Sequence, residues 1–99
     1  MTLNKTEKGV TLYHATTPKK AKLYRHTGHI IKPVRGFTTF QAALAWACKV
    51  GRTVVLEISE CNPEKTYKLP DHHNKFGEAW WHDDNAKKWS CVFSAESDA

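Results

Sequence analysis

The spacing of hydrophobic and polar positions predicts a helix in the middle of the chain. Apolar residues recur there at steps of three and four and form one stripe: Phe40, Ala43, Leu44, Ala47 and Val50. Thr38 and Gln41 have the spacing of a capping box, so we expect the helix to begin near Thr39. Gly51 can take the left-handed conformation that ends a helix.

A strand is predicted directly after this helix, over residues 53–58, because β-branched side chains favour an extended backbone. Val54, Leu56 and Ile58 fall on one face of it. Val55 falls on the other face, and apolar residues on both faces indicate an inner strand. Cys48, beside the helical stripe, is expected to be buried.

The first third of the chain has a similar pattern in the opposite order. Residues 10–15, VTLYHA, alternate as a strand, and a helix is expected over residues 18–27 with a threonine cap, Pro18 in its first turn and Gly28 as its end. The expected inward residues of that helix are Ala21, Leu23 and Tyr24. Residues 29–34 contain Pro33, which favours an edge strand or an extended connection.

The last third is rich in turns and short elements. Residues 66–69 are a candidate strand between two proline turns, and residues 78–81, EAWW, are a candidate strand lining a cleft. Residues 83–88, DDNAKK, are a candidate short helix, and residues 90–94 a final strand with Val92 pointing inward. We expect one domain over residues 10–94, a flexible N-terminus over residues 1–9 and a polar tail over residues 95–99.

Composition narrows the class of protein. The 99 residues support a single core, and the apolar and charged fractions of 40% and 25% are those of a soluble globular protein. No apolar run approaches the ~18 residues of a membrane span, and the N-terminus lacks the apolar core of a secretory signal. We therefore expect a cytoplasmic protein without a membrane partner, and a monomer.

The sequence gives little indication of a metal site or of a nucleic-acid-binding site. Three cysteines without a CxxC spacing and six histidines without a ligand spacing lead us to expect no metal site. The net charge of +5 is compatible with a phosphate-bearing partner. The lysine runs at residues 19–22 and 87–88 are more typical of solvated helix surface than of a nucleic-acid site.

The order of these elements resembles the ADP-ribosyltransferase-like fold. Small bacterial and phage members of that family begin with an LYHGT-like strand and carry an FTT-x-x-x-AL-x-[YW]A helix before a V-V-L strand. The chain has LYHATTP, then GFTTFQAALAWA, then VVLEI, so the likeness covers about half of it, residues 11–58. The resemblance implies an α+β domain with a small bent or split sheet packed by two or three helices.

The resemblance also implies an NAD site. His14 matches the family's histidine, which hydrogen-bonds a ribose hydroxyl of NAD while backbone nearby, here at Ala15, holds the nicotinamide amide. Thr16 matches the hydroxyl residue two positions later.

The family's second motif supplies a stacking tyrosine and a hydroxyl near the nicotinamide ribose. It corresponds to Arg35, Gly36, Phe37 and Thr38. No tyrosine stands there, and Phe37 is the candidate to stack instead.

Glu78 is the candidate for the family's third motif, a catalytic glutamate. In a transferase, this carboxylate would support the positive charge that develops as nicotinamide leaves.

Three functions follow as alternatives. The first is an NAD-binding or ADP-ribose-binding domain that uses His14, with or without Glu78 as a catalytic residue in mono-ADP-ribosyl transfer to a macromolecular target. The second is a catalytically inactive interaction module of a phage or mobile element, with the same fold. The third is a basic nucleic-acid-binding module in which Trp80, Trp81 and Trp89 stack on bases. Each of the two catalytic candidates also has an interpretation without function. His14 can be a histidine that is hydrogen-bonded only to backbone, and Glu78 can be a solvated surface residue.

Overall fold

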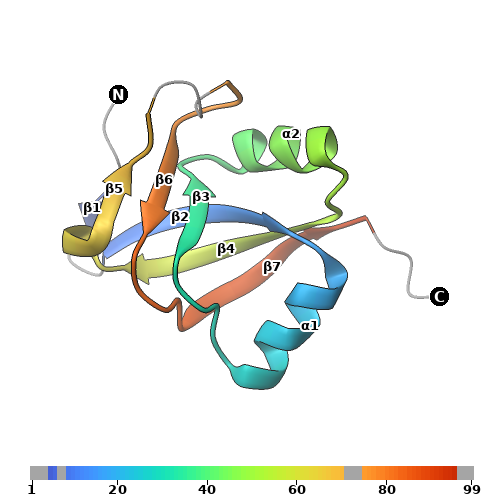
Figure 1. The fold of residues 1–99 in the computed structure, drawn as a ribbon, viewed down its shortest axis with the longest axis horizontal. Coiled ribbons are helices and arrows are strands. Elements are labelled where there is room, and N and C mark those ends of the chain that lie inside the picture. Colours follow the sequence, from blue (N-terminus) through green and yellow to red (C-terminus); the bar gives the residue numbers. More distant parts are fainter. Residues whose placement is uncertain (1–4, 7–8, 71–74, 96–99) are drawn as a thin grey trace.

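The chain folds into one antiparallel sheet with a helix on each face (Figure 1). The computed structural model describes residues 5–6, 9–70 and 75–95. The strands in this part of the chain are β1 (Lys5–Thr6), β2 (Gly9–Thr16), β3 (Val34–Phe37), β4 (Val54–Cys61), β5 (Thr66–Lys68), β6 (Ala79–His82) and β7 (Lys88–Ser94). The helices are α1 (Pro18–Thr27) and α2 (Phe40–Val50), with a short 3-10 turn, Pro63–Lys65. The strand order is β5-β6-β3-β2-β4-β7, and β1 pairs with β2. The predicted α+β class is confirmed.

The sheet bends between β2 and β3. In Figure 1, β5, β6 and β3 run across the direction of β2, β4 and β7. β2 pairs with β3 at Tyr13 and Phe37, whereas it pairs with β4 from Val10 to Thr16. Gly36 allows this close crossing, because a Cβ atom there would lie 2.9 Å from Leu12 Cβ. Beyond the crossing, the two strands diverge and leave room for side chains between them.

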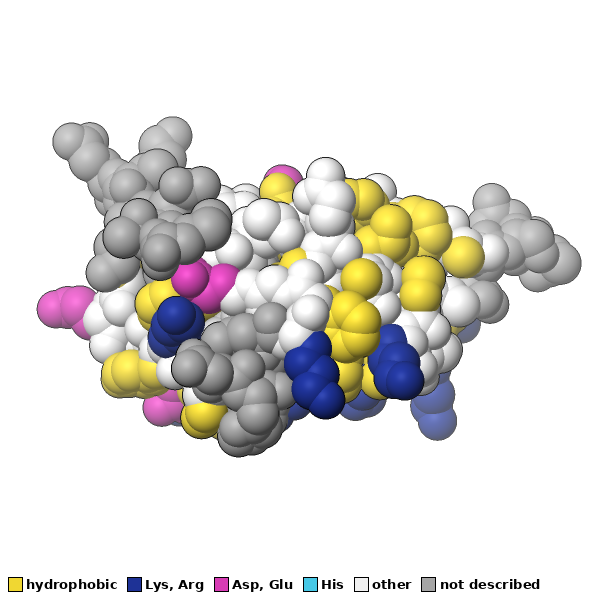
Figure 2. Space-filling model, turned by 90° about the horizontal axis from the view of Figure 1, so that it is seen from above, with side chains coloured by type: hydrophobic (Ala, Val, Ile, Leu, Met, Phe, Trp, Pro, Cys, Tyr) yellow, Lys and Arg dark blue, Asp and Glu magenta, His cyan; other side chains and the backbone are white. Residues whose placement is uncertain are grey.

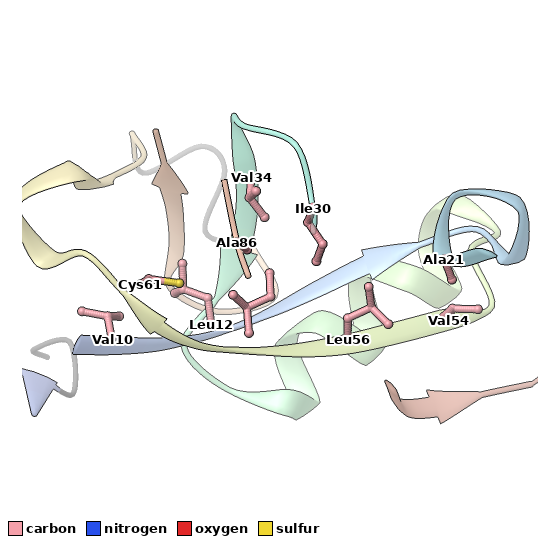
Figure 3. Packing of buried hydrophobic residues seen from close by; sticks show 10 residues of the cluster. Val10, Leu12, Ala21, Ile30, Val34, Val54, Leu56, Cys61 and Ala86 are labelled. Atoms are coloured by element: carbon pink, nitrogen blue, oxygen red, sulfur yellow. The ribbon is translucent and has the colours of Figure 1, made fainter. Parts of the chain in front are cut away.

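The first core lies inside the bend of the sheet, where β2 and β4 face Ile30, Val34 and Ala86, and Ala21 of α1 lies at one end of it (Figure 3). It consists of Val10, Leu12, Ala21, Ile30, Val34, Val54, Leu56, Ile58, Cys61 and Ala86. Tyr24, Trp80 and Trp89 pack against it from its margin. Val10 and Leu12 of β2 and Val54, Leu56 and Ile58 of β4 supply this face, as the alternation predicts. Cys61 joins them out of phase, because the pairing of β2 with β4 shifts its register between Val10 and Leu12.

The second core lies under α2, on the opposite face of the sheet. It consists of Ala15, Phe37, Ala42, Ala43, Ala47, Val55 and Ala79. Alanines on α2 let the helix approach the sheet closely. Val55 and Leu56 thus serve different cores, so β4 is buried on both faces between β2 and β7, and the prediction of an inner strand is confirmed.

Both predicted helices are present, with one correction to a cap. α1 begins at Pro18 after the cap Thr17 and ends at Gly28, which has φ 87°. α2 ends at Gly51 as predicted, but its cap is Thr39, not Thr38: the Thr39 hydroxyl accepts from the Ala42 N–H. Neither helix is long and apolar enough to cross a membrane, and the described residues contain no other that is.

Several expected inward residues point outward instead. Leu23, Val50 and Val92 are 49%, 41% and 42% exposed. Leu23 lies outside the narrow face of α1, around Ala21, that meets the sheet, and β7 is an edge strand with little packed on its outer side. The predicted burial of Cys48 is also wrong, since this side chain is exposed on α2.

Two connections differ from prediction as well. Residues 83–88 form no helix, because Ala86 makes an isolated bridge with Ile30 and the Asn85 side chain accepts from the Lys32 N–H. Residues 29–33 form a connection, which is one of the two predicted alternatives, and the strand that begins at Val34 is an inner strand between β6 and β2 rather than an edge strand. Most of the predicted flexible N-terminus and polar tail lies outside the described residues, although Lys5–Thr6 pairs with β2.

Candidate functional site

Two adjoining cavities form a groove beside the bend of the sheet. The larger, here called the aromatic cavity, has a volume of about 500 Å³ and is lined by Arg35, Phe37, Trp46, Lys49, Lys75, Phe76 and Ala79. The smaller, the histidine cavity, has about 240 Å³ and is lined by His14, Ala15, Pro33, Arg35, Phe37, Trp46, Arg52 and Trp81. Because Arg35, Phe37 and Trp46 line both, the two cavities are parts of one groove.

Aromatic rings make the wall of the larger cavity. Trp46 of α2 lies between Phe37 of β3 and Phe76, with ring centroids 6.5 Å and 6.0 Å away. Phe37 is buried in the second core, whereas Trp46 and Phe76 are half-buried and keep part of their surface open. The wall can therefore pack against a flat apolar ring.

His14 spans the gap between the two diverging strands. Its Nδ1 lies 2.6 Å from the carbonyl oxygen of Arg35, and because a carbonyl can only accept, Nδ1 carries the proton. Packed protein around the ring lowers the pKa of His14 to about 4; the bond to Arg35 opposes this shift, and the cations of Arg52 and Lys20 add to it. At neutral pH the ring is uncharged, with Nε2 as an acceptor.

Cations surround the groove. Arg35 and Arg52 line the histidine cavity, and Arg35, Lys49 and Lys75 line the aromatic cavity. Arg52 is fixed by a hydrogen bond of 3.0 Å from Nη1 to the carbonyl oxygen of Ala15. Among the described residues, no Asp or Glu lines either cavity. The groove therefore attracts anions.

The structure brings four of the predicted site residues to the groove: His14, Ala15, Arg35 and Phe37. Gly36, between the last two, lies at the crossing of β3 with β2.

Thr16 and Thr38 do not line the groove. Thr16 is fully buried, and its hydroxyl has no hydrogen-bond partner in the described part of the chain. Thr38 contributes its backbone N–H to the Glu78 carbonyl oxygen, 3.1 Å away.

Glu78 is also placed away from the groove lining. Its Oε1 accepts a 2.9 Å hydrogen bond from Trp80 Nε1, and its Oε2 lies 3.7 Å from Lys68 Nζ. Side chains alternate along a strand, so Glu78 shares a face with Trp80, while Ala79 and Trp81 face the groove. The carboxylate is thus engaged on the other face of β6, and its side chain is only 10% exposed.

Ala79 and Trp81 belong to the segment that was predicted to line a cleft, but six other lining residues were not predicted from the sequence: Pro33, Trp46, Lys49, Arg52, Lys75 and Phe76. Trp46 and Lys49 are three positions apart on α2 and so share a helix face. This spacing could have indicated them, but the apolar stripe of the helix does not include them. Arg52 follows the glycine that ends α2, and this glycine directs the chain back toward β4. Lys75 and Phe76 have no periodic pattern around them.

Two other candidate sites can be placed. Trp80 and Trp89 pack against the first core, and Trp81 lines the groove on the opposite side of β6, so the three tryptophans do not form one stacking platform. Within residues 9–70 and 75–95, no cluster of three or more His, Cys, Asp or Glu could hold a metal ion. His72 and His73 lie outside the described residues.

No protein-family model, curated protein or solved structure matches the chain.

Proposed function

We propose that the groove binds NAD or another ligand that carries ADP-ribose. The observation that supports this most is the combination of aromatic rings, unopposed cations and an uncharged imidazole in one groove. An ADP-ribose ligand has the matching parts, which are a flat base, a diphosphate and ribose hydroxyls. The aromatic cavity of about 500 Å³ is of the size that ligand sites of this kind have.

Arg35 is the residue proposed to bind the diphosphate. It lines both cavities, so it is the basic residue that a ligand extending through the groove can contact in either part. A guanidinium can donate two parallel hydrogen bonds to phosphate oxygens, which are stronger than bonds between neutral groups. Arg52 already donates Nη1–H to Ala15, and its remaining N–H groups can add to the same anion site.

The two ends of the groove then take the two uncharged parts of the ligand. A base packs against Trp46 in the aromatic cavity, where Phe37 and Phe76 hold the indole in place. A ribose occupies the histidine cavity and donates a hydroxyl hydrogen bond to His14 Nε2, because Nδ1–H is already bonded to Arg35. The placement of His14 beside a groove at the bend of the sheet supports an ADP-ribosyltransferase-like arrangement of the fold.

The proposal covers binding of an ADP-ribose ligand but not transfer of ADP-ribose to a target. Transfer of ADP-ribose needs a fixed anion beside the ribose to support developing positive charge. The described lining of the groove supplies cations, and the Glu78 carboxylate is engaged by Trp80 and Lys68 on the other face of β6. These observations favour a catalytically inactive module that keeps the ligand site.

A fluorescence titration tests this proposal. Because Trp46 and Trp81 line the groove, we expect ADP-ribose to change tryptophan emission and to saturate. The Arg35→Gln variant should bind about tenfold more weakly, since it loses a charge-assisted hydrogen bond. Lys65→Gln, with the same change of charge on the 3-10 turn, should bind as the wild type does.

Equal weakening by both substitutions, or no response of the wild type to ADP-ribose, would overturn the proposed ligand. A mass increase of one ADP-ribose unit on an added protein or nucleic acid, dependent on NAD, would show that the protein is a transferase and that binding is not its whole function.

A further inference from the structure

The charges are distributed unevenly along the chain. Residues 9–56 contain eight basic residues and no Asp or Glu. The eight are Lys19, Lys20, Lys22, Arg25, Lys32, Arg35, Lys49 and Arg52. The acidic residues of the described part all lie between Glu57 and Asp84. On the face drawn in Figure 2, most of the blue Lys and Arg side chains lie toward the right and most of the magenta Asp and Glu side chains toward the left.

The basic residues of this segment are also not neutralised. Lys65, Lys68 and Lys88 each lie within 4.0 Å of a carboxylate oxygen, on Asp84, Glu78 and Glu60 respectively. Among the described residues, no such carboxylate is found for any of the eight. Their charges therefore remain available to an anionic partner.

Four of these cations are on α1, and three of them, Lys19, Lys20 and Lys22, line an apolar hollow. The hollow has a volume of about 620 Å³ and is lined by Thr17, Lys19, Lys20, Lys22, Leu23 and His26. We call these six residues the basic α1 surface. Leu23 is 49% exposed and is one of the lining residues, so its side chain gives the hollow an apolar floor beside the ammonium groups of the lysines.

This surface is next to the groove but is not part of it. Lys20 is close enough to His14 to lower its pKa, and Tyr24 on the same helix lies 6.5 Å from His14 between ring centroids. Positive charge thus continues from α1 to the groove, where Arg35 and Arg52 follow.

We propose that the basic α1 surface docks a single-stranded nucleic acid, whose phosphates pair with the lysines and whose unpaired base covers Leu23. Unneutralised cations spaced along a helix complement a chain of phosphates. The apolar floor requires an accessible base face, which a duplex hides in its stack. A membrane surface is the poorer partner, because α1 exposes Leu23 without the broad apolar face that an interfacial helix buries. The proposal does not depend on ADP-ribose binding in the groove.

Fluorescence anisotropy with a labelled oligothymidylate of about 20 nucleotides tests the proposal. We expect binding that weakens linearly with the logarithm of salt concentration, with a slope of about −0.7 for each phosphate contact. The double variant Lys19→Gln, Lys22→Gln loses two contacts, so its slope should be smaller by about 1.4 and its affinity at ~0.1 M salt lower by about 10- to 30-fold. Circular dichroism should be unchanged, because both side chains are exposed.

The matched control is Lys65→Gln, Lys87→Gln, which removes the same charge away from α1 and should bind within about twofold of the wild type. If both double variants bind equally weakly, net charge alone explains the binding, and the proposed docking surface is wrong. The proposal also fails if the wild type shows no binding at low salt, or if it binds a duplex or anionic vesicles more tightly than the single strand.

Discussion

At the scale of single residues, His14 decides the chemistry of the groove. Its bond to the Arg35 carbonyl fixes which nitrogen carries the proton, and packing around the ring keeps it uncharged. Protonating it would add a positive charge near the cations of Arg52 and Lys20. The histidine therefore presents Nε2 as a hydrogen-bond acceptor at neutral pH and is a source of instability in acid.

The first prediction concerns stability in acid. The pKa of His14 is lowered from 6.5 to about 4, so the unfolded chain binds more protons than the folded protein between these values, and stability falls as pH falls through this range. We expect His14 to lower the free energy of unfolding by about 2 to 3 kcal/mol as the pH falls through this range. Urea unfolding of wild type and His14→Gln at pH 7, 5 and 4 measures it as the difference between the two pH profiles. Parallel profiles would contradict the lowered pKa.

The second prediction concerns the three thiols. Cys61 is buried in the first core, and burial raises the pKa of its thiol to about 11, whereas Cys48 and Cys91 are exposed. Only a thiolate attacks a disulfide reagent. We expect two thiols to react rapidly with Ellman's reagent in the native protein and all three in denaturant. Three rapid reactions without denaturant would show that the first core opens readily at Cys61.

At the scale of elements, the start of α2 distinguishes two neighbouring threonines. The Thr39 hydroxyl accepts from the Ala42 N–H at 3.2 Å, so Thr39→Ala should lower the free energy of unfolding by about 1 kcal/mol. Thr38→Ala leaves this cap in place and should cost less than about 0.5 kcal/mol. Chemical denaturation of both variants provides the comparison, and the reverse ranking would place the cap at Thr38.

The close crossing of β2 and β3 predicts whether an alanine at position 36 raises or lowers the free energy of unfolding. An alanine Cβ at position 36 would lie 2.9 Å from Leu12 Cβ and 3.2 Å from the Tyr13 carbonyl oxygen. Gly36→Ala should therefore cost about 1 to 3 kcal/mol and weaken ligand binding in the adjoining groove. An uncrowded glycine replaced by alanine would instead gain about 0.4 to 1 kcal/mol. A gain measured by thermal or urea unfolding would contradict the close crossing.

The sequence predicts the local elements better than their long-range pairing. Caps, glycine ends and apolar periodicity act within a few residues, and they suffice for α1, α2, β2 and β4. The inner position of β3 depends on pairing with β6, about 45 residues later, and no local signal encodes that register. For the same reason, the resemblance of the sequence indicates His14 and Arg35 as candidate site residues but not Trp46 or Phe76, which line the same groove from α2 and from the segment before β6.

At the scale of the whole molecule, one bend organises both the fold and the candidate site. It separates the ends of β2 and β3, and the gap is lined by His14 from one strand and Arg35 from the other. α2 closes the gap on one side with Trp46, and α1 on the other face carries the basic α1 surface. Lys20 of the basic α1 surface is close enough to His14 to lower its pKa, so the two basic regions are neighbours.

The most direct test of ADP-ribose binding is a map of amide and indole chemical shifts in labelled protein, with NAD added to about 1 mM. The groove predicts saturable shifts for His14, for the backbone of β3 and for the indole N–H of Trp46, with β7 unaffected. An unchanged spectrum at that concentration, or shifts confined to residues away from the groove, would contradict it.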